Sequence, residues 1–449
     1  MADHNAVTTS KKDSPYPSSL TPPSILSQLS QALSDLATTI DWPRVLVLIF
    51  LPLYGLHQSL STPLYPSTFL WSFVLYWTTG LGITAGYHRL WAHTSCRACF
   101  PLRVFLALAR AGAMEGSIRW WARDHRAHHR WTDTPRDPYS VTKGFWHAHM
   151  GWLLFRDGTK RVGRVDISDL DQDPVVMWQH RHFGLLSIAC ALVFPVAVGS
   201  AWGDPWGAFV YAGILRLFFT HQCTFCVSSL AHWIGEATFE DRKTPRDHWI
   251  TALFTFGEGY HNFHHTFPSD YRNGIAWWQY DPTKTVIRVW EWMGLAVDLK
   301  RFGDGEVVKS RILMEERRVE GLRKEVEERK KGLVWGPGLK DLPIVEWDDF
   351  VERVNAKEEL LVVVGVVHDV GAFVGQHPGG GGGALIKSFV GKDATAVFNG
   401  GVYDHGAPAR NLLSTMRVAV LRGGGEVEVW KRDSGFVEAG PTAKIPILA

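Results

Sequence analysis

The sequence has almost no net charge and few cysteines. Its 449 residues contain 47 Lys and Arg against 45 Asp and Glu, a formal net charge of +2. This balance offers no basic field for nucleic acid, so no nucleic-acid partner is expected. The five cysteines are an odd number and do not suggest a disulfide framework.

Two cysteine pairs have the CxxC spacing of a zinc site: Cys96 with Cys99, and Cys223 with Cys226. Zinc binds thiolates, and the apolar run around Cys223 and Cys226 disfavours the charged thiolate form. We therefore interpret the cysteines as structural or incidental. The first forty residues are rich in Ser, Thr and Pro and lack the basic-then-apolar pattern of a signal peptide, so we expect a flexible tail there.

Four long apolar segments are present in the first half of the chain. Each has close to the roughly twenty residues that a helix needs to cross a bilayer. They run approximately from Trp42 to Leu60, Thr68 to Tyr87, Phe183 to Ser200 and Trp206 to Leu230. The short connections within each pair lack Lys and Arg, whereas the stretch from His88 to His182 is rich in Arg. The positive-inside rule therefore places that stretch and both chain ends in the cytosol.

Arginine also occurs within apolar sequence. Arg103 and Arg110 interrupt the stretch from Pro101 to Met114, which predicts an amphipathic helix on the membrane or over the cytosolic domain. Arg216 lies inside the fourth apolar segment, where a charge is costly and is usually partnered or functional, but the sequence does not name its partner.

Nine of the 20 histidines form motifs that predict a metal centre. HRLWAH contains His88 and His93, HRAHH contains His125, His128 and His129, HNFHH contains His261, His264 and His265, and His232 stands alone after the fourth apolar segment. Residues three or four apart share a helix face, so each HxxHH motif can bind one metal with its first histidine and one of the last two. Imidazole suits iron, copper, zinc and nickel, and nine ligands suit two ions better than one.

These motifs resemble the histidine boxes of membrane-bound acyl-CoA desaturases, especially the fungal stearoyl-CoA type. The similarity covers roughly Pro43 to Lys300 and includes GITAGYHRLWAH, WARDHRAHHRWTDTPRDPY, HMGWLL and KTPRDHWITALFTFGEGYHNFHHTFPSDYRNG. It implies a cytosolic helical domain that holds two irons above four membrane helices, with all nine histidines as iron ligands. It also implies O2-dependent insertion of a cis double bond between carbons 9 and 10 of stearoyl- or palmitoyl-CoA, in the endoplasmic reticulum membrane.

The resemblance also assigns substrate residues. Arg123 and Asp124 precede the second box and Arg156 follows HMGWLL, positions that correspond to contacts with the CoA portion; ordinary solvated charge is the alternative. Ser228 stands where the family usually has an Asn that helps to hold an iron through water. Tyr76, twelve residues before His88 and roughly 18 Å deeper in a helix, is expected to close the far end of the acyl tunnel and to disfavour longer chains.

From Trp347 onward the sequence changes to short β-rich runs, followed by HPGG and GKDATAVFNGGVYDHG. This part, roughly Leu342 to Leu421, resembles a cytochrome b5 domain. The resemblance assigns the two axial ligands of haem b to His377 and His405, and bis-histidine ligation fits electron transfer because it leaves no open position. His368 is expected at a strand end and not as a ligand.

Three further glycines, Gly381 to Gly383, follow HPGG. They make the loop about two residues longer than usual and unusually free in conformation. A loose loop beside His377 predicts that haem occupancy is below one per chain.

The sequence thus predicts a mainly α membrane protein with four transmembrane helices, a cytosolic helical di-iron domain and a small α+β cytochrome b5-like domain. The expected parts are an N-terminal tail (1–41), a membrane desaturase domain (42–300), a charged helical linker (301–341), the haem domain (342–425) and a C-terminal tail (426–449). The chain lacks a nucleotide-binding glycine fingerprint, so electrons from NADH are expected to arrive through a separate cytochrome b5 reductase.

Two alternatives stay open. One is a related histidine-box desaturase or hydroxylase that acts on another lipid. Front-end desaturases carry their cytochrome domain at the N-terminus and usually begin the third box with Gln, whereas this chain has a C-terminal domain and His261. The other is a non-catalytic haem-binding membrane homologue, against which the presence of all nine box histidines argues.

Overall fold

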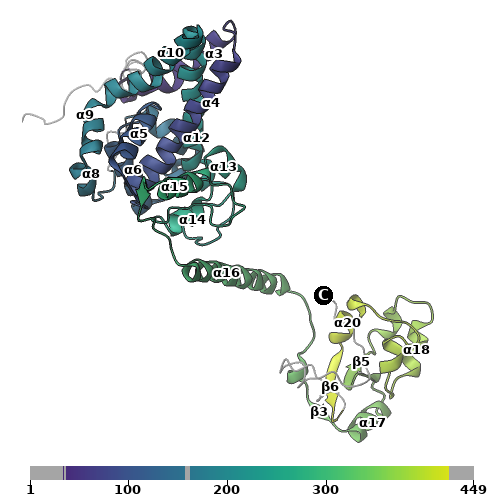
Figure 1. The fold of residues 1–449 in the computed structure, drawn as a ribbon. Helices are drawn as coiled ribbons and strands as arrows, with labels where there is room; N and C mark the ends of the chain where they lie inside the picture. The colour runs from purple at the N-terminus through teal and green to yellow at the C-terminus, as the bar shows by residue number, and fades with distance from the viewer. Residues whose placement is uncertain (1–33, 35–36, 157–161, 424–449) are drawn as a thin grey trace, which may run out of the picture. The chain divides into compact units, whose positions relative to one another are not determined.

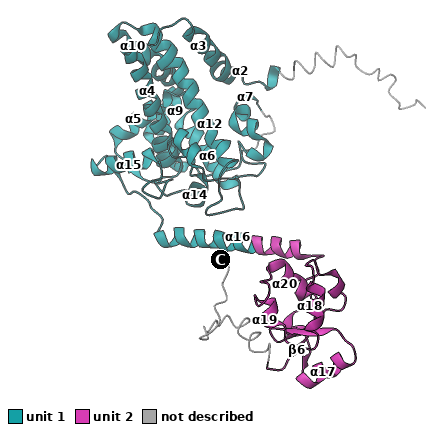
Figure 2. Ribbon diagram, turned by 90° about the vertical axis from the view of Figure 1, so that its right-hand side faces the viewer, with its two compact units in different colours: residues 1–321 teal, residues 322–449 magenta. Residues whose placement is uncertain are grey.

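The computed structural model describes residue 34, residues 37–156 and residues 162–423, and the chain divides into two compact units (Figure 2). Unit 1 comprises Met1–Gly321 and unit 2 comprises Leu322–Ala449. Most of the expected N-terminal tail and all of the expected C-terminal tail lie outside the described residues.

Unit 1 consists of helices and one small sheet. Up to the second histidine motif the elements are α2 (Trp42–Val45), η1 (Leu46–Phe50), α3 (Leu51–Ser59), α4 (Pro66–Leu81), η2 (Gly82–Ala92), β1 (Arg97–Ala98), α5 (Phe100–Ala111) and α6 (Ile118–Trp131). Then follow η3 (Val141–Lys143), η4 (His147–Gly151), α7 (Trp152–Leu154), α8 (Ser168–Gln172), α9 (Pro174–Ile188), η5 (Ala189–Val193), α10 (Phe194–Gly199) and η6 (Ser200–Trp202). The rest are α11 (Pro205–Gly207), η7 (Ala208–Leu215), α12 (Arg216–Ser228), η8 (Leu230–His232), α13 (Trp249–Phe254), α14 (His261–Thr266), α15 (Pro282–Trp292), β2 (Ala296–Val297) and the first part of α16 (Asp304–Lys330), whose last residues, from Leu322, belong to unit 2.

All four apolar segments are helical over most of their length, but one helix has the length and composition of a membrane span. It runs over 29 residues, Pro174–Trp202, and contains the third predicted segment. No other helix among the described residues has this length and composition, so the prediction of four spans is not confirmed. The second and fourth helices carry polar side chains such as Thr79 and His221, which dilute their apolar character.

The fourth apolar segment lies at the centre of this helical layer. Its η7 packs against α3, α4 and α10, and α12 packs against α4. Figure 1 shows α3 and α10 at one end of unit 1, with α14 at the opposite end. Arg216, whose partner the sequence did not reveal, is buried and donates to three backbone carbonyls, those of Gly112 (2.6 Å), Ala191 (3.1 Å) and Ala212 (3.0 Å).

The predicted amphipathic stretch forms α5. Leu102, Leu106 and Arg110 are buried on one face, and Phe100 and Phe105 are exposed on the other. The buried face packs on η2 and α9, so α5 covers the helix that carries the first histidine motif. An antiparallel pairing of β1 with β2 joins the start of α5 to the end of α15.

The charged stretch predicted as a linker (301–341) contains one long helix. It is α16, whose 27 residues include Val307, buried in unit 1 against Phe239, Phe263 and Phe267. The apolar stripe predicted within it, including Ile312 and Leu322, is about half exposed among the described residues.

Unit 2 is a small α+β fold. Its elements are η9 (Leu339–Asp341), β3 (Ile344–Val345), α17 (Trp347–Asn355), β4 (Leu360–Val363), β5 (Val366–Asp369), η10 (Val374–Gln376), α18 (Gly382–Ser388), α19 (Thr395–Phe398), α20 (Ala407–Ser414) and β6 (Arg417–Leu421). The sheet order is β3-β6-β5-β4, with β3 parallel to β6 and the other neighbours antiparallel. One face packs on Phe350 of α17, and the other lies towards α18 and α19 through residues such as Leu361 and Ile386.

Candidate metal centre

The first histidine motif lies in a π-helical segment. The N–H of His93 bonds to the carbonyl of His88 at 3.0 Å, a bond between residues five apart. In an α-helix such residues point about 140° apart, whereas the wider π-turn brings them to one side. The two rings are accordingly neighbours, with centroids 4.9 Å apart.

Each HxxHH motif lies on one helix, and each of these two helices contributes histidines to two different groups. On α6, His125 and His129 lie one turn apart and point to one group, while His128 points to another. On α14, His261 and His265 belong together and His264 points the opposite way. The lone His232, in η8, completes the second group.

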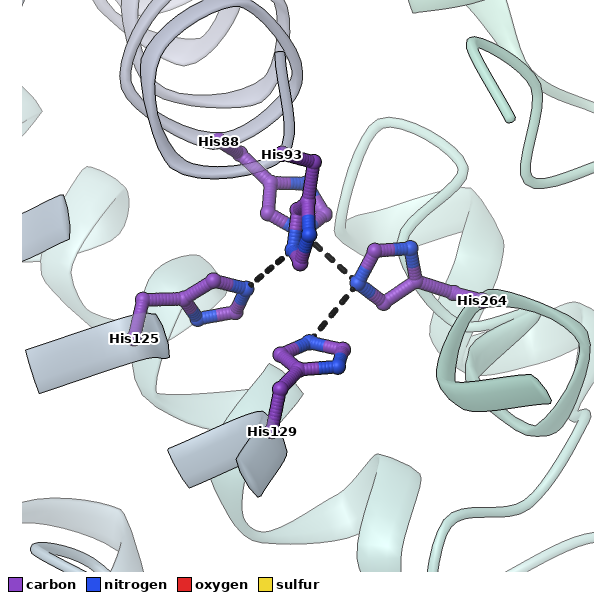
Figure 3. A group of neighbouring side chains, drawn as sticks. All are labelled: His88, His93, His125, His129 and His264. Atoms are coloured by element: carbon purple, nitrogen blue, oxygen red, sulfur yellow. Dashed lines mark hydrogen bonds between the residues drawn. The ribbon is translucent and has the colours of Figure 1, made fainter. Parts of the chain in front are cut away.

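The nine histidines thus form two separate clusters. The five-histidine cluster contains His88, His93, His125, His129 and His264 (Figure 3), and the four-histidine cluster contains His128, His232, His261 and His265. Within each cluster one ring nitrogen of every member lies within 4.8 Å of all the others. Neighbouring Nε2 atoms are 2.8 Å apart for His93 and His125, and 3.1 Å apart for His232 and His261. Two nitrogens bound at right angles to one ion at about 2.1 Å would be separated by about 3 Å, so both clusters fit a metal.

The surroundings of seven of the nine histidines favour the neutral form of the ring. Burial, followed by the effect of the neighbouring rings, lowers the pKa of His93, His125, His129, His232, His264 and His265 well below its ordinary value. The same causes lower the pKa of His261 to about 3. A neutral imidazole has the free lone pair that a metal needs. The buried Nε2 of His128 has no hydrogen-bond partner among the described residues, and an ion in the four-histidine cluster would satisfy it.

The other ring nitrogen of several histidines lies close to a side-chain oxygen outside the clusters. His88 Nδ1 lies 2.9 Å from Glu258, His128 Nδ1 lies 2.9 Å from Asp137, and His232 Nδ1 lies 2.8 Å from the Thr244 hydroxyl. Such partners hold the proton on Nδ1 and leave Nε2 free for metal. Burial alone would raise the pKa of Glu258, but His88 and Arg89 lower it to about 2, so this partner is a carboxylate. The motif analysis did not identify these partners, although Glu258 lies only three residues before His261.

Both clusters border one apolar cavity of about 430 Å3. His88 and His125 of one cluster and His128 and His261 of the other are in its wall. The rest of the lining is largely apolar, as at Val47, Leu48, Ile83, Phe183, Val227 and Phe256. Trp121 also lines it and stacks on His125 at 4.8 Å.

The three charged residues predicted to contact CoA occupy different places. Asp124 is buried in the cavity lining and accepts from Arg123 Nε at 2.7 Å. Arg123 and Arg156 are not in that lining. Arg156 is exposed and lies 3.7 Å from Asp41.

Sequence analysis missed Arg44, which is in the cavity wall. Arg44 lies 3.8 Å from Asp41 and over the ring of Trp120, so Arg44, Asp41 and Arg156 form one charged group beside the cavity. Arg44 was counted within the first apolar segment. A charge inside such a segment is itself a functional signal.

Ser228 is in the cavity wall, whereas Tyr76 lies behind it. Tyr76 is not in the lining; its hydroxyl is 2.9 Å from Cys223 Sγ and its ring is 5.3 Å from that of Phe256, and both of these residues do line the cavity. Ser228 lines the cavity directly and donates to the Ala148 carbonyl at 2.9 Å.

Unit 2 has a second large cavity, of about 980 Å3, between His377 and His405. Their ring centroids are 6.4 Å apart. An iron with imidazoles on opposite sides at about 2 Å would hold the centroids roughly 6 Å apart, which fits a haem. His405 Nδ1 donates to the Phe398 carbonyl at 3.0 Å, so its Nε2 is free for iron. His368 is on β5, outside this cavity.

Two of the three added glycines, Gly382 and Gly383, are closely packed beside or near His377. A Cβ on Gly382 would overlap the His377 ring, and a Cβ on Gly383 would lie 2.5 Å from the Val374 carbonyl. Gly381 has a φ of +84°, which favours glycine. By contrast, nothing lies within 4 Å of a Cβ on Gly380. Low haem occupancy remains a prediction, but this loop contains three positions that favour glycine: Gly381, Gly382 and Gly383.

Two families match the chain, one in each unit. The fatty acid desaturase family matches residues 64–296. The family described as a cytochrome b5-like heme/steroid binding domain matches residues 346–422. The segment between the two matches, residues 297–345, contains α16.

Proteins named as acyl-CoA or stearoyl-CoA desaturases match more than half of the chain. The chain is 50% identical over 397 residues to a probable acyl-CoA desaturase of Schizosaccharomyces pombe, covering 88% of this chain and 80% of that protein. It is 44% identical over 400 residues to acyl-CoA desaturase 1 of Saccharomyces cerevisiae, covering 88% and 77%. It is 37% identical over 268 residues to human stearoyl-CoA desaturase 5, covering 58% and 81%. The chain therefore belongs to the fatty acid desaturase family, in the form that carries a cytochrome b5-like domain after the desaturase domain.

Proposed function

We propose that the protein is an O2-dependent acyl-CoA desaturase that inserts a cis double bond between carbons 9 and 10 of a saturated acyl-CoA such as stearoyl- or palmitoyl-CoA. Two irons in the histidine clusters and a haem b between His377 and His405 are its cofactors. Electrons pass from NADH through a separate cytochrome b5 reductase to the haem and then to the irons.

The observation that carries this proposal is the apolar cavity with both histidine clusters in its wall. A saturated acyl chain has no polar group, so only an apolar cavity can hold a section of it away from water. His88 and His125 border the cavity from one cluster, and His128 and His261 border it from the other. A chain methylene in this cavity would therefore lie beside both metal positions.

Each part of the site has a chemical task. When bound, the irons supply the activation of dioxygen that removal of hydrogen from an unactivated methylene requires. The histidines hold them with neutral donors, and Glu258 and Asp137 fix the orientation of His88 and His128. Trp121, stacked on His125, and the apolar lining keep water away from the reacting carbons.

Charged residues beside the cavity are proposed to bind the CoA portion. Arg44 in the cavity wall and Arg156, both near Asp41, suit the phosphates and the thioester end of the substrate. Asp124, which lines the cavity, and Arg123, which donates to it, are proposed as further contacts with the CoA portion. Tyr76 is proposed to limit chain length indirectly, by supporting Cys223 and Phe256 in the cavity wall.

The proposed location is the endoplasmic reticulum membrane, with four spans and both chain ends in the cytosol. Large apolar side chains support this, because they are exposed on the helices of the first two apolar segments, as at Phe50, Leu53, Phe69 and Phe73. Exposed apolar surface on adjacent helices is unusual in a soluble protein and matches a lipid-facing layer.

The test is product analysis. Membranes that contain the protein would receive stearoyl-CoA, O2, NADH and a cytochrome b5 reductase, and the acyl products would be analysed for the position and geometry of the double bond. We expect oleoyl product from the native chain and none from His128→Ala. Protein that binds iron and haem but forms no double bond, or forms it elsewhere in the chain, would overturn the proposal.

A further inference from the structure

The short helix α13 presents an apolar face at the surface of unit 1. Four of its six residues, Trp249, Ile250, Leu253 and Phe254, are between 41% and 64% exposed, and the other two are buried. Residues four apart on a helix are neighbours, so Trp249 lies beside Leu253 and Ile250 beside Phe254. The exposed face of α13 is therefore apolar throughout. Large apolar side chains that are exposed side by side mark a binding surface.

The apolar surface continues onto the segment that follows the fourth apolar helix. Trp233 and Ile234 come directly after η8 and are also exposed. An antiparallel bridge between Glu236 and Asp247 holds this segment beside the residues that precede α13. The two segments thus form one surface, the α13 patch, which comprises Trp233, Ile234, Trp249, Ile250, Leu253 and Phe254.

The α13 patch adjoins the helices that carry the second and fourth apolar segments. The helix α13 packs on α12, and Figure 1 shows it between the long helices of unit 1 and α14. Phe256, two residues after α13, has its ring 4.9 Å from that of Trp77 on α4. Phe73, one turn before Trp77, is one of the exposed apolar side chains of α4. The patch therefore begins where the proposed lipid-facing surface of α4 ends.

The length and composition of this region favour the membrane interface over the bilayer core. With six residues, α13 is far shorter than the roughly twenty that a spanning helix needs. Tryptophan and tyrosine prefer the level of the lipid headgroups, and the patch contains two tryptophans. A loop with Trp277, Trp278 and Tyr280 adds further exposed rings, Trp277 being 93% exposed. This loop leads to Asp281, whose Cα would lie 2.8 Å from a Cβ on Gly257, so it returns close to the end of α13.

We propose that the α13 patch lies in the headgroup region of the bilayer, with its tryptophans at the boundary to the acyl chains of the lipid. This inference rests on the proposed membrane location and adds a contact outside the four spans. The residues between the fourth apolar segment and α14 then do not all face water. The contact also concerns the reaction site, because Thr255 and Phe256, directly after α13, line the apolar cavity of unit 1. Lipid bound to α13 holds this part of the cavity wall at the membrane surface.

The experiment measures the depth of single side chains in a bilayer. Full-length protein is placed in phosphatidylcholine nanodiscs, with a nitroxide label on Phe73→Cys of α4, on Trp249→Cys of the α13 patch, or on Val334→Cys, an 81% exposed position. Electron paramagnetic resonance then gives the collision rate of the label with O2, which concentrates in lipid, and with a nickel complex, which stays in water. The labelled native chain supplies the background from its five cysteines.

The three positions should give three different ratios of O2 to nickel collisions. We expect the highest ratio at Phe73→Cys, an intermediate ratio at Trp249→Cys and the lowest ratio at Val334→Cys, since interfacial helices lie about 5–10 Å into the boundary of headgroups and acyl chains. Leu253→Cys, one turn after Trp249 on the same face, should match Trp249→Cys. This second variant replaces the first if the loss of Trp249 prevents folding.

The outcomes separate this inference from the proposed location. If both patch positions gave the ratio of Val334→Cys, the patch would face water, as expected of a surface that awaits a protein partner, and the inference would be overturned. A ratio equal to that of Phe73→Cys would place α13 within the bilayer core and would contradict it too. If Phe73→Cys itself gave the ratio of Val334→Cys, the membrane location would fail, and this inference with it.

Discussion

At the scale of single residues, the histidines of the metal centre use both ring nitrogens. Nε2 atoms converge on the two clusters, while Nδ1 atoms of His88, His128 and His232 meet Glu258, Asp137 and Thr244. Thr244 in turn donates to Asp133 at 2.6 Å. The buried carboxylates therefore hold the rings in place, and their loss should weaken metal binding without removing a ligand.

Asp137→Asn tests this arrangement in the four-histidine cluster. The amide keeps the shape of the side chain but removes the negative charge that holds the His128 proton, so iron affinity should fall by about 10- to 100-fold. Iron content after dialysis against a weak chelator is the measurement. Asp171→Asn, which changes an exposed ion pair with Arg119, is the matched control and should retain iron like the native chain. If both variants retained equal amounts of iron, Asp137 would have no part in holding the ligand His128.

A second residue prediction concerns the haem loop. Gly382→Ala should displace the His377 ring and abolish the Soret absorbance of bound haem, because the added methyl group would overlap that ring. Gly380→Ala adds the same methyl group two residues away, where nothing lies within 4 Å, and should bind haem normally. If both variants bound haem equally, His377 would not be held as described.

Arg44 gives a third test, in substrate binding. Arg44→Gln should raise the KM for stearoyl-CoA by roughly tenfold with little change in kcat, since loss of a charge-assisted hydrogen bond costs about 1.5–3 kcal/mol. Arg97→Gln removes an exposed arginine that pairs with Asp298 at the surface, and its KM should not change. A fall in kcat alone would instead place Arg44 outside substrate binding.

At the scale of elements, short helices position the ligands, and tertiary contacts stabilise these helices. The helix α14 has only six residues, and its first residues lack a local side-chain cap. Instead, Asp247 from a distant loop accepts hydrogen bonds from the N–H groups of Asn262 at 2.8 Å and Phe263 at 3.1 Å. Since α14 supplies His264 to one cluster and His261 and His265 to the other, this cap supports both metal positions.

Asp247→Ala should therefore reduce iron retention at both clusters, in contrast to Asp137→Asn, which should affect one. Loss of a helix cap costs about 1 kcal/mol, and here it also leaves two buried N–H groups unpaired. The melting temperature in detergent should fall together with iron content. Asp298→Ala, a change at the surface, is the control. Loss of iron from a single cluster would show that Asp247 does not act through α14.

The elements also show where sequence reasoning reached its limit. The HxxHH spacing predicted that each motif shares a helix face, but residues three and four apart fit a face equally well, so the division into clusters needed the structure. In both motifs the partners are four apart: His125 with His129, and His261 with His265. The pairing of His88 with His93 depends on a π-helical segment, which no apolar periodicity indicates.

At the scale of the whole molecule, the order of the two units was predictable and the membrane layer was predictable only in part. The motifs HRAHH and HPGG are local, so a single sequence reveals them. Membrane spans depend on length and summed apolar content, and among the described residues one of the four predicted segments lies in a helix that has both, Pro174–Trp202. Arg44 was missed because it was counted within the first apolar segment, and its contact with Trp120, 76 positions away in the sequence, is visible only in the fold.

The two units form one electron-transfer enzyme if the haem of unit 2 serves the metal centre of unit 1. Fusion keeps the donor at a high effective concentration, so no free haem protein is required once the haem is reduced. This is the central claim, and it concerns the full chain and not either unit alone.

The most direct test is a single turnover without reductase. Full-length protein loaded with iron and haem is reduced under anaerobic conditions, freed of reductant and mixed with O2, with or without stearoyl-CoA, while haem absorbance is followed and the acyl product is measured. We expect stearoyl-CoA to accelerate haem reoxidation and to yield oleoyl product, and His265→Ala to show neither effect. Haem that reoxidises at the same rate with and without stearoyl-CoA, with no double bond formed, would contradict the account.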